Sequence, residues 1–490
     1  MEEPGQVPKT EPPDEGRVDL RSLGQFVPLV AALIGSVVAF WPAINSPFYS
    51  DDYIYLGASR NLSFSEYLRA SLFPYSNAAD LGLVTQFFWR PLAFLSFGVL
   101  EPLLGGNATG YHLLLLGIHL VSVGMVWLLA KQLTGRWEAA GIAAIVFAVH
   151  PAAFEGVAWI SSLSNAGLPL MLGAWVLFIR ATHHEPPKFC WLLCSAALFA
   201  IALGFRESTV AVVPAIAAWW LLCRRREHLC DRGTYAPFVP FVAVVIAYAL
   251  LRTRFLTEPA TSDEVWSLGR HVPEQSWYYI KVSALPLTST GNGAVRGLQV
   301  LAGLFVLALL PLFIACRRWL PAALFAGFLF AVLPYAPLVL GVSPRYLYFP
   351  VAFLALALGA AGVELLDVVR ARVSPAVFAG FVGVIGVVLF AAGVVSTHER
   401  TADWVVRGPN VEQAWVEELR ASYPVLASGS TLYCANVPLV LALFEDANLQ
   451  PVVQFYYPGV VAERFELAEL SRVQATLGPG DRIFIPAGTR

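Results

Sequence analysis

Residues 111–131 read YHLLLLGIHLVSVGMVWLLAK, and Lys131 at the end is the one Lys, Arg, Asp or Glu in this stretch. A bilayer hydrocarbon core of about 30 Å needs about 20 apolar residues in a helix, so the run predicts a transmembrane helix. The composition of the chain agrees. Of its 490 residues, 57% are hydrophobic and 13% are charged, whereas soluble domains carry about 25% charged residues.

Ten further apolar runs predict a polytopic, mainly α transmembrane bundle of about 11 spans. The run 137–150 is short, but His150-Pro151 gives it a clear end because proline does not continue a helix. The expected spans are residues 25–44, 111–131, 137–150, 164–180, 189–205, 208–223, 236–253, 297–315, 320–340, 346–364 and 376–395.

The segment 91–104 is also apolar, but prolines 91 and 102 interrupt it, and we interpret it as a helix lying in the membrane interface. With a cytoplasmic N-terminus and this helix not crossing, the short Lys- and Arg-rich loops all face the cytoplasm, as the positive-inside rule expects. Those loops contain Lys131 and Arg136, Arg180 and Lys188, 224–226, 317–318, and Arg370 and Arg372.

This orientation divides the chain into three parts. Residues 1–24 are acidic and proline-rich and predict a disordered cytoplasmic tail. Residues 25–395 form the transmembrane domain, with a long outer loop at 45–110. Residues 396–490 predict a small α/β domain on the outer face, with a helix at 411–422 and strands at 431–435, 451–456 and 482–485.

Ionisable residues gather at the expected outer boundary, where they are costly and often functional. Asp51 and Asp52 follow the first span, and a carboxylate there could accept a proton from an attacking hydroxyl. The competing interpretation is a solvated pair or a helix cap. Arg90, between Trp89 and Pro91, could bind a phosphate or could snorkel to ordinary lipid headgroups.

Three more groups follow along the chain. Arg206 and Glu207 lie between two spans. They could form an ion pair with each other, or Arg206 could bind a donor phosphate. His150 and Glu155 form a polar cap, or Glu155 orients an acceptor or a catalytic arginine, and they are too few for a metal site. A late motif could bind a phosphate and pack a sugar ring, or anchor the helix in an aromatic belt. This motif contains Arg345, Tyr346 and Tyr348.

With its motifs in this order along the spans, the sequence resembles the GT-C class of membrane glycosyltransferases. The resemblance is to the protein O-mannosyltransferase-like branch of that class, which includes the tetratricopeptide-repeat transmembrane O-mannosyltransferases. The likeness extends over about residues 25–365. In place of the repeats of those proteins, this sequence has a region of about 95 residues. The segments that carry the likeness are Asp51-Asp52, FWRPL at 88–92, LSF at 95–97, YHL at 111–113, FAVHP at 147–151, EGVAW at 155–159 and RYLYFP at 345–350.

The resemblance implies an enzyme that moves a sugar from a polyprenyl-phosphate donor to an acceptor hydroxyl at the outer membrane face, with inversion. It implies that Asp51 or Asp52 is the catalytic base, and the sequence does not choose between them. Donor phosphate binding carries over to Arg90 and Arg345, and Arg206 is a third candidate. The candidates for positioning acceptor or sugar are His150, Glu155, Glu207, Tyr346 and Tyr348.

The alternative is a polytopic transporter or a lipid-linked sugar flippase, for which inverted repeats and midplane charges would be typical, and neither is found in the sequence. A non-catalytic scaffold is a third reading. We expect no firm cofactor, with a divalent metal left open, and no nucleic acid partner, since the net charge is −2. The expected partners are the bilayer, the lipid-linked sugar and a protein or glycan acceptor, at a bacterial cytoplasmic membrane.

Overall fold

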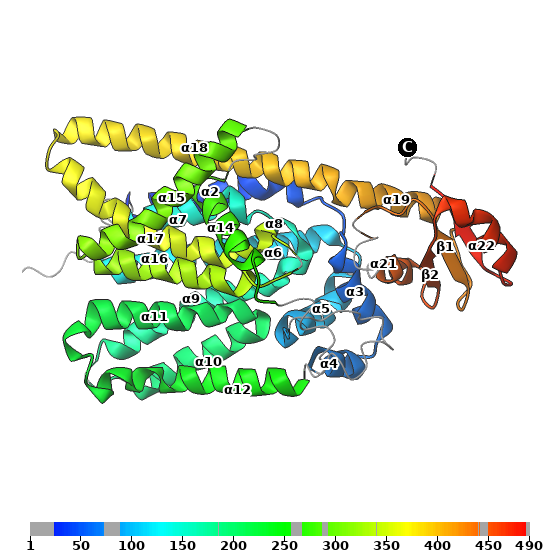
Figure 1. The fold of residues 1–490 in the computed structure, drawn as a ribbon, viewed down its shortest axis with the longest axis horizontal. Coiled ribbons are helices and arrows are strands. Elements are labelled where there is room, and N and C mark those ends of the chain that lie inside the picture. Colours follow the sequence, from blue (N-terminus) through cyan, green and yellow to red (C-terminus); the bar gives the residue numbers. More distant parts are fainter. Residues whose placement is uncertain are drawn as a thin grey trace, which may run out of the picture.

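The computed structural model describes residues 24–72, 89–184, 186–255, 267–286, 293–339, 341–439, 441 and 449–486. The tail expected at 1–24 therefore lies almost wholly outside the described residues. A bundle of long, roughly parallel helices makes up most of the described chain (Figure 1). Its helices are α2 (Val27–Phe40), α6 (Ala108–Thr134), α7 (Trp137–Ala148), α9 (Gly167–Thr182), α10 (Phe189–Phe205), α11 (Val212–Trp219), α12 (Val239–Phe255), α15 (Gly293–Ala315), α16 (Trp319–Val332), α17 (Tyr348–Arg370) and α18 (Pro375–Arg407).

The described residues of each of the eleven expected apolar runs lie in one of these helices or in short helices and turns that extend them, such as η3 (Ile160–Ala166) before α9 and η4 (Glu207–Ala211) before α11. Within the described residues, six helices are long and apolar enough to cross a membrane by length and composition alone. The others are shorter, so the prediction of about 11 spans stays a prediction.

Several segments between the long helices also fold into helices: α5 is the helix expected at 91–104, whereas the others were left as loop by the sequence. Helices α3, α4 and α5 gather at one end of the bundle, which we call the loop end (Figure 1). At about 1.5 Å per residue, the 14 residues of α5 measure roughly 21 Å, short of a hydrocarbon core of about 30 Å. The additional helices are α3 (Asp51–Asn61), α4 (Phe64–Leu72), α5 (Pro91–Leu104), α8 (Glu155–Ala158) and α14 (His271–Ala284).

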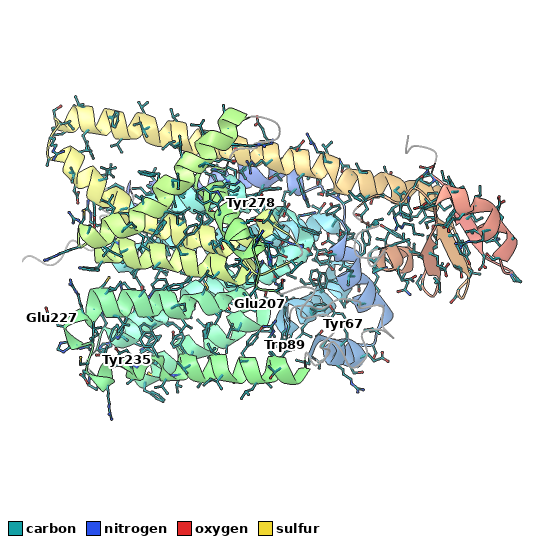
Figure 2. The ribbon with its side chains drawn as sticks, in the orientation of Figure 1. Tyr67, Trp89, Glu207, Glu227, Tyr235 and Tyr278 are labelled. Atoms are coloured by element: carbon teal, nitrogen blue, oxygen red, sulfur yellow. The ribbon has the colours of Figure 1, made fainter. Side chains whose placement is uncertain are left out.

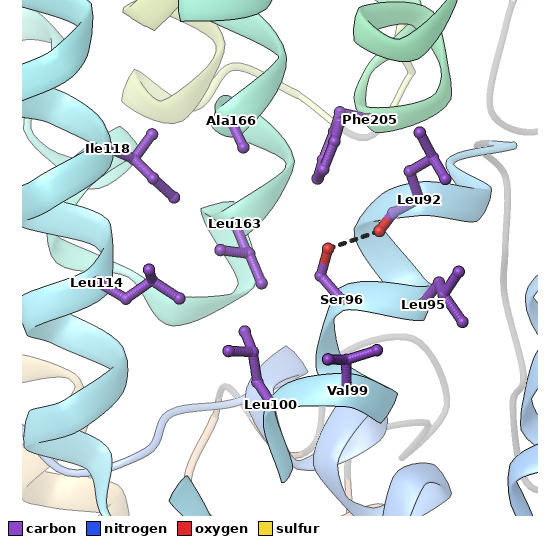
Figure 3. Close-up of a pocket in the computed structure, with 10 residues that line it drawn as sticks. All are labelled: Leu92, Leu95, Ser96, Val99, Leu100, Leu114, Ile118, Leu163, Ala166 and Phe205. Carbon is purple, nitrogen blue, oxygen red and sulfur yellow. Dashed lines mark hydrogen bonds between the residues drawn. The ribbon is translucent and has the colours of Figure 1, made fainter. Parts of the chain in front are cut away.

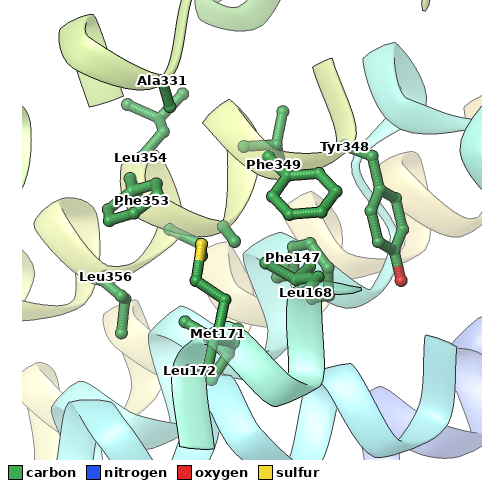
Figure 4. Close-up of a cluster of buried hydrophobic side chains, with 14 of the residues drawn as sticks. Phe147, Leu168, Met171, Leu172, Ala331, Tyr348, Phe349, Phe353, Leu354 and Leu356 are labelled. Carbon is green, nitrogen blue, oxygen red and sulfur yellow. The ribbon is translucent and has the colours of Figure 1, made fainter. Parts of the chain in front are cut away.

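Helix α17 lies at the centre of the buried core and packs against α7 and α16. Figure 4 shows side chains from α7, α9, α16 and α17 meeting there, among them Phe147, Met171 and Phe353. The approach of α17 to α7 is close at Gly359, where a Cβ atom would lie 2.5 Å from the carbonyl oxygen of Ala139. A small residue is therefore required at this crossing.

Helix α18 is 33 residues long, or roughly 50 Å at the usual rise, and so extends well beyond a hydrocarbon core. The half that approaches the loop end is fastened to the bundle: Thr397 Oγ1 donates to the carbonyl oxygen of Val149 at 2.9 Å, and Arg400 donates to the carbonyl oxygens of Pro151 and Pro286. The domain boundary expected at 396 thus falls inside a continuous helix.

Residues 409–486, here called the C-terminal unit, combine helices with a small parallel sheet of order β2-β1-β3. The central strand pairs Leu432 with Ala462 on one side and with Arg482 on the other. The unit stands beyond the loop end, at the far end of α18 (Figure 1). Its elements are α19 (Pro409–Ser422), β1 (Thr431–Cys434), α21 (Leu449–Tyr456), β2 (Val461–Arg464), α22 (Leu470–Thr476) and β3 (Arg482–Phe484).

The strand expected at 451–456 is wrong, because these residues belong to helix α21. Leu449, Val452 and Val453 are buried, and this spacing of three and four residues is helical. The β-branched valines favoured a strand, but packing decided the outcome. Strand β2, of sequence VAER, was not predicted because its residues are half-buried or exposed and show no apolar alternation.

The C-terminal unit shares a hydrophobic core with the loop end. Phe48 and Tyr53 at the start of α3 pack in one buried cluster with Val416 of α19 and Val452 of α21. Phe455 meets the rings of Phe48 and Tyr53 edge to face, with centroids 5.9 and 5.2 Å apart. Because buried apolar surface is the main stabilising term, the two parts support each other.

We predict that Gly359→Ala lowers the apparent melting temperature of the detergent-solubilised protein by several degrees, equivalent to about 2 kcal/mol, because the added methyl overpacks the α7–α17 crossing. The matched control is Gly380→Ala on α18, where a Cβ atom would meet nothing within 4 Å. Equal melting temperatures for the two variants would show that the crossing is not closely packed.

Candidate functional site

The turn before α3 brings two adjacent acids to the loop end in different environments. Ser50 precedes them with φ 53° and ψ −112°, a backbone conformation that a residue other than glycine rarely adopts. Such strain persists only where surrounding contacts hold it, and it is frequent at functional sites. The two carboxylates that follow differ in exposure and partners.

Asp52 is 1% exposed, and both of its oxygens accept backbone hydrogen bonds. Oδ1 accepts from the N–H of Ser161 at 2.7 Å, and Oδ2 accepts from the N–H of Tyr49 at 2.9 Å. Burial raises the pKa of Asp52 well above its usual range, although both hydrogen bonds oppose this shift. Asp52 therefore fastens the turn to the segment after α8.

Asp51 remains reachable, with 29% of its side chain exposed. Its Oδ2 lies 3.3 Å from Nη1 of Arg345, which comes from the turn before α17. Its Oδ1 accepts a hydrogen bond from the Ser50 hydroxyl at 3.3 Å. Of the two acids, Asp51 is the one that a substrate could meet beside a guanidinium group.

Arg345 is held by an aromatic ring and by its own backbone. Its guanidinium carbon lies 4.3 Å from the centroid of Trp159, a cation–π distance. The backbone N–H of Arg345 donates to Glu155 Oε2 at 3.2 Å, and the Ser343 hydroxyl donates to the same oxygen at 2.7 Å. Burial raises the pKa of Glu155, and these hydrogen bonds lower it. Glu155 thus shapes the turn that presents Arg345.

Arg90 and Glu207 form a bidentate ion pair at the loop end. Arg90 Nε donates to Oε2 at 2.7 Å, and Nη2 donates to Oε1 at 2.5 Å. The two side chains are 15% and 11% exposed, so the pair is largely removed from water. Figure 2 labels Glu207 and Trp89, the neighbour of Arg90, near α5. The pair connects the start of α5 to the turn between α10 and α11.

Arg206 is buried, at 2% exposure, and within the described chain it forms no ion pair. Its guanidinium donates to Asn165 Oδ1, to Ser164 Oγ and to the hydroxyl of Tyr335. Aromatic rings surround it as well, with Phe349 5.4 Å and Tyr346 5.9 Å from its guanidinium carbon. Its hydrogen-bond partners are neutral, and the charge closest to it in sequence is that of Glu207, whose pKa Arg206 lowers.

Tyr55 on α3 shows that the separate charges surround one place. Its ring packs between Phe94 and Phe97, with centroids 4.7 and 4.8 Å away. The pKa of the Tyr55 phenol is raised to about 12: burial is the main cause, Asp51 adds to the rise, and Arg90 and Arg345 oppose it. Residues distant in sequence thus act on a single hydroxyl, which the sequence did not single out.

Three predicted site residues have other surroundings. His150 Nδ1 accepts from the N–H of Ala152 at 3.3 Å and Nε2 contacts the Ser283 carbonyl at 3.1 Å, so the ring acts as the polar cap. Tyr348 is 1% exposed and points into the core, 3.1 Å from His119 Nδ1 (Figure 4). Tyr346 stacks on Tyr335, with centroids 4.8 Å apart, beside Arg206. His150 and Tyr348 therefore do not face a position that a substrate could occupy.

Glu412 on α19 was missed. It is 0% exposed, and its Oε1 and Oε2 accept from the N–H of Ser50 at 3.0 and 3.1 Å. Burial raises the pKa of Glu412 to about 8. In the sequence it is one of several acids on an amphipathic helix, so no local signal distinguishes it. Among the described residues, no three His, Cys, Asp or Glu side chains come together as a metal site would require.

Two apolar hollows flank the start of α5. One, of about 380 Å³, lies between α5, α6 and η3 and is lined by residues such as Leu95, Leu114 and Leu163 (Figure 3). The other, also of about 380 Å³, lies between α5, α10 and α12 and includes Trp89 and Tyr248. The second hollow begins next to Arg90, and both could accept a hydrocarbon chain.

We predict that Asp52→Ala lowers the free energy of unfolding by roughly 2–3 kcal/mol, because two buried backbone N–H groups lose their acceptor. Asp51→Ala is the matched control and should change stability little, since its side chain is partly exposed. The apparent melting temperature of each variant in detergent measures the difference. A larger loss in Asp51→Ala would reverse the roles that we assign to the two acids.

Comparison with known proteins supplies independent information. Residues 91–251, about a third of the chain, match the family model described as dolichyl-phosphate-mannose-protein mannosyltransferase. The chain is 29% identical over 136 residues to the protein O-mannosyl-transferase tmtc2 of Xenopus laevis, covering 27% of this chain and 16% of that protein. It is 44% identical over 145 residues to the protein O-mannosyl-transferase Tmtc1 of Drosophila melanogaster, covering 29% and 15%. The matched part is thus a small share of these relatives.

Solved structures give a likeness over most of the chain. The oligosaccharyltransferase of Archaeoglobus fulgidus, tethered with an acceptor peptide, aligns with a TM-score of 0.52 and 13% identity, covering 91% of this chain and 64% of that one. AglB from the same organism, with an inhibitory peptide and a dolichol-phosphate, aligns with a TM-score of 0.51, 13% identity and coverage of 91% and 65%. The chain therefore has a GT-C fold, and over residues 91–251 it is O-mannosyltransferase-like in sequence.

Proposed function

We propose that this chain is a membrane glycosyltransferase that transfers a sugar from a polyprenyl-phosphate carrier to an acceptor hydroxyl at the outer face of the membrane. The observation that carries the proposal is the contact of a reachable carboxylate, Asp51, with the guanidinium of Arg345 at the loop end. Arg90 lies close enough to this region that it and Arg345 both lower the pKa of the Tyr55 phenol. The O-mannosyltransferase-like sequence of residues 91–251 and the GT-C fold give this chemistry its context.

Asp51 is the better candidate for the base. A base must reach the proton that it removes, and Asp51 is partly exposed while both oxygens of Asp52 already accept backbone N–H groups. We therefore assign Asp52 to holding the turn. This choice separates two neighbours that the sequence left equivalent.

Arg345 is the leading candidate for the donor phosphate, because 27% of its side chain is exposed and it faces Asp51. A guanidinium can bind a phosphate with two parallel hydrogen bonds. Arg90 is paired with Glu207, and Arg206 is buried, so we assign them to the positive field around the phosphate. Glu155 and Glu207 then position Arg345 and Arg90 rather than an acceptor.

In the proposed reaction the acceptor oxygen attacks the anomeric carbon from the side opposite the phosphate. The new carbon–oxygen bond forms as the bond from that carbon to the phosphate oxygen breaks, which inverts the configuration. The hydroxyl proton passes to Asp51, and the negative charge that grows on the leaving phosphate is stabilised by Arg345. The carrier tail would occupy the apolar hollow lined by Trp89 and Pro91, the two sequence neighbours of Arg90.

We predict that Asp51→Asn reduces turnover of the lipid-linked sugar by about 10³-fold, because the amide cannot accept the proton. Purified protein would be supplied with a panel of polyprenyl-phosphate sugars and an acceptor extract, and release of polyprenyl phosphate would be measured. The control is Glu417→Gln on the exposed face of α19. Wild-type turnover by Asp51→Asn would remove the assignment of the base.

A second prediction concerns Arg345. Arg345→Gln should reduce kcat by about 10²–10³-fold, because a charge-assisted contact to the leaving phosphate is lost. Arg345→Lys should be intermediate, since it keeps the charge but not the planar fork. Arg372→Gln, at an exposed site between α17 and α18, is the control. An equal effect of the Gln substitutions at 345 and 372 would contradict the role.

A further inference from the structure

We propose that the C-terminal unit is part of the working site, and that Glu412 is a positioning residue that holds the turn carrying Asp51. This inference rests on the proposed function of Asp51 and goes beyond it, because it gives a role to residues that follow the region shared with the O-mannosyltransferases. The matched family region ends at residue 251, whereas Glu412 comes 362 residues after Ser50 in the chain.

The backbone just before Asp51 is strained. Ser50 has φ 53°, and its N–H points to the carboxyl group of Glu412, at 3.0 Å from Oε1 and 3.1 Å from Oε2. Asp51 is the next residue, so the orientation of the Ser50 peptide sets the direction in which α3 begins and the Asp51 side chain leaves. A conformation of this kind needs external support to persist.

Different parts of the chain hold the backbone groups of the turn before α3. The N–H of Tyr49 is held by Asp52, and the carbonyl of Tyr49 accepts from Trp159 Nε1 at 3.1 Å. These contacts come from the membrane bundle and from the turn itself. The contact to the Ser50 N–H comes from the C-terminal unit, so both parts of the chain determine the geometry of the turn.

Burying the carboxyl group of Glu412 is unfavourable for its ionised form. The side chain is 0% exposed, and burial raises its pKa to about 8, which shows that its ionised form is disfavoured there. An apolar residue of the same size would fill the space without this cost. The hydrogen bond to Ser50 is the contact that accounts for a carboxyl group at this position.

Further contacts make the C-terminal unit a firm support. Arg60 of α3 stacks over the ring of Phe455 at 3.8 Å, and the hydroxyls of Tyr53 and Tyr456 lie 3.4 Å apart. These contacts fasten the body of α3, whereas Glu412 acts on its first turn. Loss of Glu412 should therefore change the position of Asp51 more than the stability of the unit.

The test uses the full chain in lipid nanodiscs with three variants. Glu412→Leu removes the acceptor, Glu412→Gln keeps a carbonyl that can accept from Ser50, and Glu417→Leu makes the same replacement on the exposed face of α19. We expect Glu412→Leu to lose at least about tenfold in kcat with KM for the lipid-linked donor nearly unchanged, as displacement of a reacting group predicts. Glu412→Gln should recover most of this loss, and Glu417→Leu should equal wild type.

Hydrogen exchange provides a readout that does not need activity. The Ser50 amide should exchange faster in Glu412→Leu than in wild type and in Glu417→Leu, since its acceptor is removed. If the wild type turns over no polyprenyl-phosphate sugar, the proposed function fails while the exchange experiment still tests the hydrogen bond. If the wild type is active and Glu412→Leu keeps both wild-type kcat and slow Ser50 exchange, the inference is overturned.

Should Glu412→Leu not yield folded protein, Glu412→Asp replaces it. The shorter side chain keeps the carboxyl group but draws it back from Ser50. A loss of kcat with unchanged donor KM supports the positioning role, and wild-type kcat with slow Ser50 exchange overturns it.

Discussion

The ion pair between Asp51 and Arg345 joins residues 294 positions apart, and the candidate site depends on it. Charged groups that are partly buried at a membrane boundary are costly unless other protein groups pair with them. The bundle supplies these partners in two linked pairs, Asp51 with Arg345 and Arg90 with Glu207. Both pairs lie at the loop end, and charges from each pair change the pKa of the Tyr55 phenol.

The backbone around these pairs is held by three further acids, of which Asp52 and Glu412 are buried and Glu155 is half-buried. Asp52 holds the segment after α8, Glu155 holds the turn before α17, and Glu412 holds the Ser50 peptide. The general scheme is that a reachable ion pair is presented by neighbouring carboxyl groups, buried or half-buried, that accept backbone N–H bonds. Buried acids of this kind rigidify a site when they are fully satisfied.

Much of the bundle could be predicted from the sequence, because a helix in a membrane must carry about 20 apolar residues and such runs are plain. The first-loop acids and the late arginine could also be predicted, since ionisable residues stand out against an apolar chain. The roles of Asp51 and Asp52 could not be separated, because burial distinguishes them and burial is a tertiary property. Tyr348 and His150 were assigned to the site because they lie near its other residues in the sequence. In the structure the Tyr348 side chain packs in the core, and the His150 ring caps the turn that follows it.

The C-terminal unit was the least predictable part. Its short strands carry little apolar pattern, as β2 shows, and its helix α21 has the valines of a strand. Its core is shared with the loop end, so its packing depends on residues more than 300 positions away. No sequence window contains that information, and the role of Glu412 follows from it.

The most direct test of the account is a structure of the protein in nanodiscs with polyprenyl phosphate bound. The account predicts a phosphate within hydrogen-bond distance of the Arg345 guanidinium, about 3 Å, with the Asp51 carboxylate facing the space beside it. A phosphate bound instead at the opposite end of the bundle, next to Arg136 and Arg370, would contradict it.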